Sequence, residues 1–133
     1  VIPSLISKFN RAIKQNNSDV IVWGTGEPLR EFMHVDDMAD ACIHILKLSE
    51  EYYKNYSFVN VGTGNEISIK ELAALISKIS GFKGKIIFDN SKPDGTMRKL
   101  LDVSLLNKLG WKSKISLEAG LIRTYNWYKE NYG

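Results

Sequence analysis

Residues 23–41 read WGTGEPLREFMHVDDMADA and contain the change from strand to helix that decides the fold. Residues 20–23 are a short apolar run, ended by a turn with two glycines and a proline. Residues 30–35 then alternate like a second strand. Asp36 and Asp37 place negative charge where a helix N-terminus favours it, and apolar residues continue at helical spacing. The stretch therefore predicts strand, turn, strand and helix in succession.

The rest of the chain alternates in the same way. Residues 3–15 carry apolar side chains at helical spacing, with a proline in the first turn. Ser68 and Glu71 form a capping box for a helix that Gly81 ends. Four further elements are expected: strands at residues 57–61 and 85–88, and helices capped by Asp102 and Ser116. This alternation predicts the α/β fold class.

The composition is that of an ordinary soluble globular protein. The 133 residues suffice for one domain, with 44% hydrophobic and 25% charged residues and a net charge of +3. The basic residues are scattered among acidic ones, which argues against a nucleic-acid-binding surface. No apolar run is long enough to span a membrane. The chain begins with valine, which suggests a piece of a longer protein.

The single cysteine, Cys42, excludes an internal disulfide and indicates a reducing compartment, the cytoplasm. Its position on the apolar side of the expected helix predicts a buried and unreactive thiol.

Two Gly-Thr-Gly turns, at residues 24–26 and 62–64, suggest a dinucleotide-binding loop. That fingerprint needs a third glycine three residues beyond the second, where this chain has Leu29 and Ile67. The glycines are therefore expected to provide turn geometry and close approach to the backbone. No nicotinamide cofactor is expected on this chain alone.

Two other patterns have ordinary structural explanations. Tyr125 and Lys129 match the Tyr-x-x-x-Lys pair used for proton transfer, but the helical spacing of Tyr125 with Leu121 predicts core packing. His34 and the two aspartates that follow lack metal-ligand spacing, and the aspartates already have a role at a helix start. Neither a metal site nor a catalytic residue is expected.

A cationic loop at residues 91–102, SKPDGTMRKLLD, is the remaining candidate for chemistry. Its proline and glycine specify a turn, and its three cations outnumber its two aspartates. Together with Trp23 at a strand end and Arg30 after a turn, the loop suits a nucleoside diphosphate. The alternative is a core tryptophan, a surface arginine and a solvated turn.

Several stretches resemble a known family. Residues 23–41, FVNVGTG (58–64) and DVSLLNKLGW (102–111) resemble signatures of extended short-chain dehydrogenase/reductases that act on nucleotide sugars. Four more resemble the members that convert GDP-4-keto-6-deoxy-D-mannose to GDP-L-fucose by epimerisation at two carbons and NADPH-dependent reduction: VIPSLISKF (1–9), IVWG (21–24), SKPDGTMRKLLD (91–102) and ISLEAGL (115–121). The similarity covers residues 1–132.

The resemblance implies substrate-binding roles for four residues. Trp23 packs on the nucleotide, Arg30 pairs with the diphosphate, and Asp94 accepts hydrogen bonds from hydroxyls. Lys8 stands where the family usually has arginine, so it keeps the charge but lacks the bidentate fork.

The resemblance also implies that residues 1–133 are the C-terminal, mainly sugar-nucleotide-binding part of an enzyme in the Rossmann-like superfamily. The helix after Asp36 and the strand ending at Val61 would complete the dinucleotide-binding domain. The rest of that domain, with the NADP loop and the catalytic residues, would precede Val1. The expected partner is a GDP-sugar, and neither nucleic acid nor membrane is expected.

The parent enzyme would be an NADP-dependent homodimer, and this part would be inactive alone. Two alternatives remain: part of another nucleotide-sugar epimerase or dehydratase, and a stand-alone module that binds phosphorylated ligands.

Overall fold

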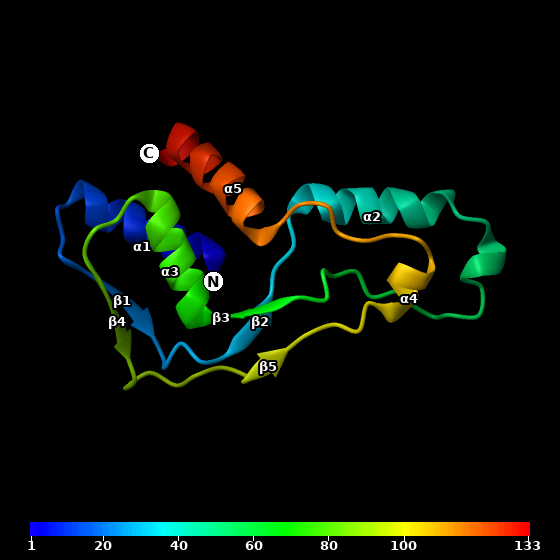
Figure 1. Ribbon diagram of the computed structural model, residues 1–133, viewed down its shortest axis with the longest axis horizontal. Coiled ribbons are helices and arrows are strands. Elements are labelled where there is room, and N and C mark those ends of the chain that lie inside the picture. The colour runs from blue at the N-terminus through cyan, green and yellow to red at the C-terminus, as the bar shows by residue number, and fades with distance from the viewer.

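The computed structural model describes residues 1–133, with helices and strands alternating along the chain (Figure 1). The helices are α1 (Ile2–Lys14), α2 (Val35–Lys47), α3 (Ile69–Ser80), α4 (Ser104–Lys108) and α5 (Leu117–Tyr132), with a 3-10 turn η1 (Glu50–Tyr52). The strands are β1 (Asp19–Trp23), β2 (Leu29–Glu31), β3 (Glu66–Ser68), β4 (Lys85–Asp89) and β5 (Arg98–Lys99). The predicted α/β class is confirmed.

The strands form two small sheets. β1 pairs in parallel with β4, with Val20 opposite Ile86. β2 is the centre of the other sheet, antiparallel to β3 and parallel to β5. Leu29 of β2 lies opposite Ser68 on one side and Arg98 on the other.

The strand predicted at residues 57–61 is absent, because this apolar segment has no neighbouring strand with which to pair. The strand predicted at residues 30–35 ends at Glu31. Strand β5 was not predicted, since it consists of two residues that pair only through the tertiary fold.

Local capping sets the helix ends. In α3, the hydroxyl of Ser68 accepts a hydrogen bond from the backbone N–H of Glu71, whose carboxylate accepts from the N–H of Ser68. Gly81 closes this helix in the left-handed conformation. Ser116 caps α5 in the same way, by accepting from the N–H of Ala119. These boundaries agree with the sequence signals.

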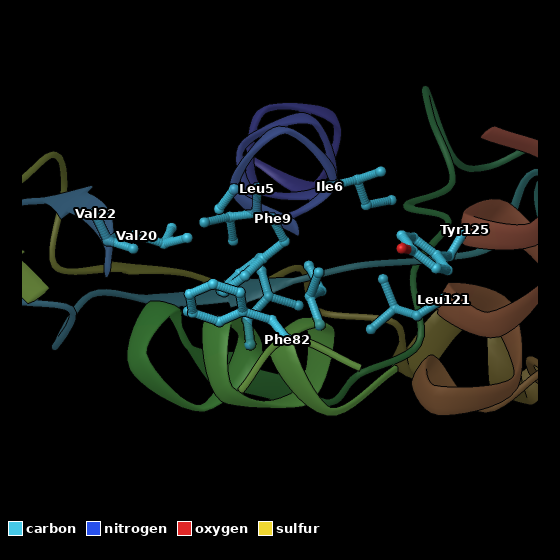
Figure 2. Packing of buried hydrophobic residues seen from close by; sticks show 12 residues of the cluster. Leu5, Ile6, Phe9, Val20, Val22, Phe82, Leu121 and Tyr125 are labelled. Atoms are coloured by element: carbon cyan, nitrogen blue, oxygen red, sulfur yellow. The ribbon is translucent and has the colours of Figure 1, made fainter. Parts of the chain in front are cut away.

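The main hydrophobic core lies between α1, α3, α5 and β1 (Figure 2). The ring of Phe9 is fully buried and meets Phe82 edge to face, with ring centroids 5.4 Å apart. Tyr125 is only 5% exposed and packs in the same cluster as Leu121, as predicted. Burial and the neighbouring Tyr128 raise the pKa of Tyr125, whereas a proton-transfer tyrosine needs a lowered one.

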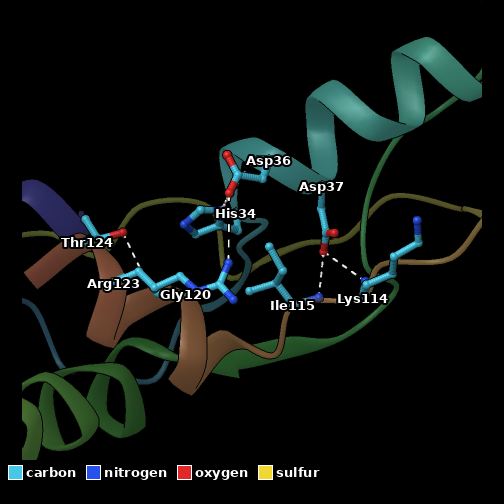
Figure 3. Close-up of polar contacts among 8 residues, drawn as sticks. All are labelled: His34, Asp36, Asp37, Lys114, Ile115, Gly120, Arg123 and Thr124. Atoms are coloured by element: carbon cyan, nitrogen blue, oxygen red, sulfur yellow. Dashed lines mark hydrogen bonds and ion pairs between the residues drawn. The ribbon is translucent and has the colours of Figure 1, made fainter. Parts of the chain in front are cut away.

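A second, smaller cluster of Ala41, Leu106 and Trp111 lies beside α2, at the other end of the molecule (Figure 1). Asp37 of α2 is 2% exposed, and its carboxylate accepts hydrogen bonds from the backbone N–H groups of Lys114 and Ile115, at 3.0 and 2.9 Å (Figure 3). Asp37 therefore fastens a distant segment to α2, beyond the helix-start role that its position suggests.

Asp40, one turn further along α2, holds the same segment. Its carboxylate accepts from the ammonium of Lys114 at 2.7 Å and from the indole N–H of Trp111 at 2.8 Å. The bond from Lys114, and then that from Trp111, keep the pKa of Asp40 below its ordinary value of 3.8.

The lowered pKa of Asp40 predicts an acid-dependent loss of stability. The contribution is fully present above about pH 3.8 and disappears as the pH falls through the lower pKa of the folded state. Urea unfolding followed by tryptophan fluorescence should therefore show a smaller drop in stability between pH 6 and pH 3 for Asp40→Asn than for the wild type. Glu130→Gln, which removes an exposed carboxylate without an ion pair, is the control. Equal drops for wild type and Asp40→Asn would contradict the assignment.

One face of α2 is apolar and open to solvent. Val35, Met38, Ile43 and Leu46 are exposed, Leu46 by 81%, and Phe58 in the following segment is 74% exposed. Cys42 is exposed as well, so the prediction of a buried thiol is wrong. The helix packs through Ala41 and its neighbours, and Cys42 lies outside that contact.

None of the helices combines the length and apolar character of a membrane span.

The exposed face of α2 predicts that this 133-residue chain self-associates. Apolar patches of this kind are unusual on isolated proteins and favour association. Leu46→Glu should shift the sedimentation profile toward monomer, whereas Ile122→Glu, at an exposed position on α5, should leave it unchanged. A stable wild-type monomer across micromolar concentrations would count against the prediction.

Candidate ligand-binding site at the ends of β1 and β4

A pocket of about 330 Å³ contains all four residues predicted to bind substrate: Lys8, Trp23, Arg30 and Asp94. Lys8 comes from α1, Trp23 is the last residue of β1, and Arg30 is in β2. Asp94 lies in the loop of residues 90–97 between β4 and β5, hereafter the 90–97 loop. The pocket lies at the carboxyl end of the parallel pair β1 and β4, where open α/β sheets commonly bind ligands.

Trp23 presents its indole to this pocket. Burial alternates along β1, so Val20 and Val22 enter the core while Trp23 remains 67% exposed. The alternative of a core tryptophan is therefore excluded. The ammonium groups of Lys8 and Lys92 lie over the ring, 5.5 and 5.9 Å from its centroid. Lys92 is thus a neighbour of the site that the sequence identified only as part of a cationic loop.

The two cations of the pocket retain free hydrogen-bond donors. Lys8 donates from Nζ to the carbonyl oxygen of Ile21 at 2.8 Å, and Arg30 donates from Nη1 to that of Leu29 at 2.7 Å. Neither side chain forms an ion pair with a carboxylate. Since a guanidinium has five N–H donors and an ammonium three, both groups can bind an anion in the pocket.

Asp94 contacts the first Gly-Thr-Gly turn. Its Oδ1 accepts from the backbone N–H of Thr25 at 2.9 Å, and its Oδ2 accepts from the hydroxyl of Thr25 at 2.6 Å. Gly24, with φ of +84°, makes this approach possible, because a Cβ there would lie 2.2 Å from Oδ1.

The second Gly-Thr-Gly turn holds another carboxylate of the protein. Glu31 accepts through Oε1 from the backbone N–H groups of Thr63 and Gly64, the latter at 2.6 Å, and through Oε2 from that of Leu101 at 3.2 Å. Both turns therefore direct backbone N–H donors at carboxylates of the protein itself.

Glu31 is the residue that sequence reasoning missed. Its partner turn lies far along the chain, with Thr63 32 positions after Glu31. The only available signal was that a Gly-Thr-Gly turn without the dinucleotide fingerprint still has backbone donors that need an acceptor.

A second pocket of about 280 Å³ lies near the start of α5 and contains none of the predicted binding residues. Its lining includes Thr63, Glu66 and Ser116. The carboxylate of Glu66 is bound by the guanidinium of Arg98 at 2.9 Å. No group of three or more histidine, cysteine or acidic side chains is arranged to hold a metal ion.

Comparisons with known proteins identify the class. The sequence model of the NAD-dependent epimerase/dehydratase family matches residues 1–62. A GDP-mannoheptose C4 reductase from Campylobacter jejuni, solved with NADP bound, superimposes with a TM-score of 0.83 and 38% identity over 96% of this chain and 44% of its own. The chain therefore has the fold of part of an extended short-chain dehydrogenase/reductase of the epimerase/dehydratase type.

Two further comparisons are with GDP-L-fucose synthases. Over 98% of its length the chain is 54% identical to GDP-L-fucose synthase of Escherichia coli (strain K12), of which it covers 42%. A GDP-L-fucose synthetase structure from Naegleria fowleri gives a TM-score of 0.86 at 29% identity, over 99% of this chain and 40% of that one. The chain thus spans about two fifths of the relatives it matches. The resemblance to GDP-L-fucose synthases is confirmed.

Proposed function

We propose that this chain is the sugar-nucleotide-binding part of an NADPH-dependent enzyme that converts GDP-4-keto-6-deoxy-D-mannose to GDP-L-fucose. The observation that carries the proposal is the meeting of Lys8, Trp23, Arg30 and Asp94 in one pocket. The similarity to GDP-L-fucose synthases supports the choice of substrate.

Each of the four side chains has a chemical role in this proposal. The free donors of Arg30 bind the diphosphate oxygens, and the ammonium of Lys8 adds a second positive charge. The exposed ring of Trp23 is the platform for the nucleotide, since aromatic faces stack on bases. Asp94 uses the lone pairs that Thr25 leaves free to accept hydrogen bonds from sugar hydroxyls.

The chemical step belongs, in this proposal, to the part of the relatives that this chain does not match. That part supplies the NADP site and the groups that move protons and hydride, so the chain alone is inactive and binds no cofactor. It also covers the apolar face of α2, including Cys42. The complete enzyme is a homodimer and acts in the cytoplasm, in keeping with a single cysteine.

A different GDP-sugar reductase is the second candidate, because the similar structure from Campylobacter jejuni is a GDP-mannoheptose C4 reductase. Calorimetric titration of the complete enzyme with GDP, UDP and dTDP separates the guanine-specific candidates from other nucleotide-sugar enzymes. Preference for GDP supports the proposal, and turnover of GDP-4-keto-6-deoxy-D-mannose then selects between the two GDP-sugar enzymes. Preference for UDP or dTDP would overturn the proposed function.

Removal of the Arg30 side chain should weaken nucleoside diphosphate binding. Arg30→Ala is expected to raise the dissociation constant for GDP by about 10- to 100-fold, since a charge-assisted hydrogen bond contributes about 1.5–3 kcal/mol. Lys83→Ala is the matched control, because Lys83 is an exposed cation just before β4, at the opposite end of the strand from the pocket. Equal affinities for wild type and Arg30→Ala would remove Arg30 from the site.

Lys8 should behave as a replaceable point charge. Lys8→Ala is expected to lower GDP affinity about tenfold, while Lys8→Arg should restore or improve it through a bidentate contact with phosphate. The same titration, with thermal melting to verify folding, tests this expectation. A loss for Lys8→Arg as large as that for Lys8→Ala would show that the bond from Lys8 to Ile21 matters more than its charge.

A further inference from the structure

The middle of the 90–97 loop, residues 93–96, is hydrogen-bonded to the rest of the molecule through one pair of residues. Its ends are tied by backbone bonds, from the N–H of Gly24 to the carbonyl of Asp89 at 3.0 Å and from the N–H of Leu29 to that of Met97 at 2.8 Å. Residues 93–96, between these ties, form no backbone hydrogen bond with any other segment. The bonds between Asp94 and Thr25 are the only side-chain hydrogen bonds that join them to the rest of the molecule.

The hydroxyl of Thr25 is directed at Asp94 by its own surroundings. Its Oγ1 accepts a hydrogen bond from the backbone N–H of Glu27 at 3.2 Å. A hydroxyl has one proton to donate, and that proton goes to Oδ2 of Asp94 at 2.6 Å. Thr25 thus presents two aligned donors, its N–H and its O–H, to the two oxygens of one carboxylate.

This contact shapes the pocket without filling it. Thr25 itself is exposed and outside the pocket lining, whereas Pro93, Asp94 and Gly95 form part of the wall. Gly95 lies next to Arg30, since a Cβ on Gly95 would come within 3.2 Å of Nη2 of Arg30. The position of the wall relative to the guanidinium therefore depends on the pair formed by Thr25 and Asp94.

We propose that Thr25 is a positioning residue of the sugar-nucleotide pocket, which latches Asp94 and the middle of the 90–97 loop in the geometry that binds substrate. The inference rests on the proposed function for the identity of the ligand. Thr25 acts through Asp94, and the step it assists is binding, because the proposed chemical groups lie outside this chain.

The test compares Thr25→Val with Thr25→Ser in the complete enzyme. Valine keeps the β-branched shape and loses the hydroxyl, whereas serine keeps both donors. Thr25→Val is expected to raise KM for the GDP-sugar about tenfold and to leave kcat within about twofold, since losing one charge-assisted hydrogen bond within the protein lowers the population of the binding geometry by about that factor. Thr25→Ser should stay within about twofold of the wild type in both constants.

A double-mutant cycle with Asp94→Asn gives a second measurement. If the two residues form one latch, the double variant Thr25→Val/Asp94→Asn should raise KM no more than Asp94→Asn alone. Thr25→Ala, with the same expected rise in KM, replaces Thr25→Val if the valine variant does not fold. Unchanged KM for the hydroxyl-free variant, an equal defect for serine, or additive effects in the cycle would each overturn the latch.

Failure of the substrate assignment is a separate result. An enzyme that prefers a UDP- or dTDP-sugar would refute the proposed function, and the same comparison of valine and serine variants with that sugar nucleotide would still decide the role of Thr25.

Discussion

Carboxylates that accept backbone N–H groups from distant segments hold this chain in shape where its sheets are too small to do so. Sheets of two and three short strands provide few ladder hydrogen bonds. Asp37 binds the backbone before α5, Glu31 binds the second Gly-Thr-Gly turn and the segment after β5, and Asp94 binds the first turn. Hydrogen bonds to ionised acceptors are about twice as strong as neutral ones, so a few of them suffice to order long irregular connections.

These carboxylate contacts also determine which donors of the protein are left to bind an anion. Backbone N–H groups of the two Gly-Thr-Gly turns donate to the carboxylates of Asp94 and Glu31. The cations Lys8 and Arg30 have no carboxylate partner and keep their donors for a ligand. In the proposed function, a diphosphate is recognised by side chains beside an exposed indole, and the first Gly-Thr-Gly turn contributes Gly26 to the pocket wall.

The two ends of the molecule differ in how fully they are packed. Around Phe9, three helices and a strand enclose a core of twelve buried residues, and the pocket is built on that core. Around Trp111 the hydrophobic cluster has only three buried residues, and α2 exposes an apolar face to solvent. This asymmetry agrees with the proposed function. The substrate pocket lies on the well-packed end, and the other end presents the apolar surface that the rest of the enzyme would cover.

Short-range chemistry in the sequence determined the helix ends at Ser68 and Ser116 and the α/β alternation. Side-chain chemistry singled out Trp23 and Arg30 as ligand-binding candidates, whereas Lys8 and Asp94 were expected from the family resemblance, and the fold brings all four into one pocket. Tertiary structure alone decided that residues 57–61 form no strand, that Cys42 is exposed and that Glu31 holds a turn. The physical reason is distance along the chain. A cap bonds to a group three residues away, whereas Thr25 and Asp94 are 69 residues apart, and only the folded chain brings such groups together.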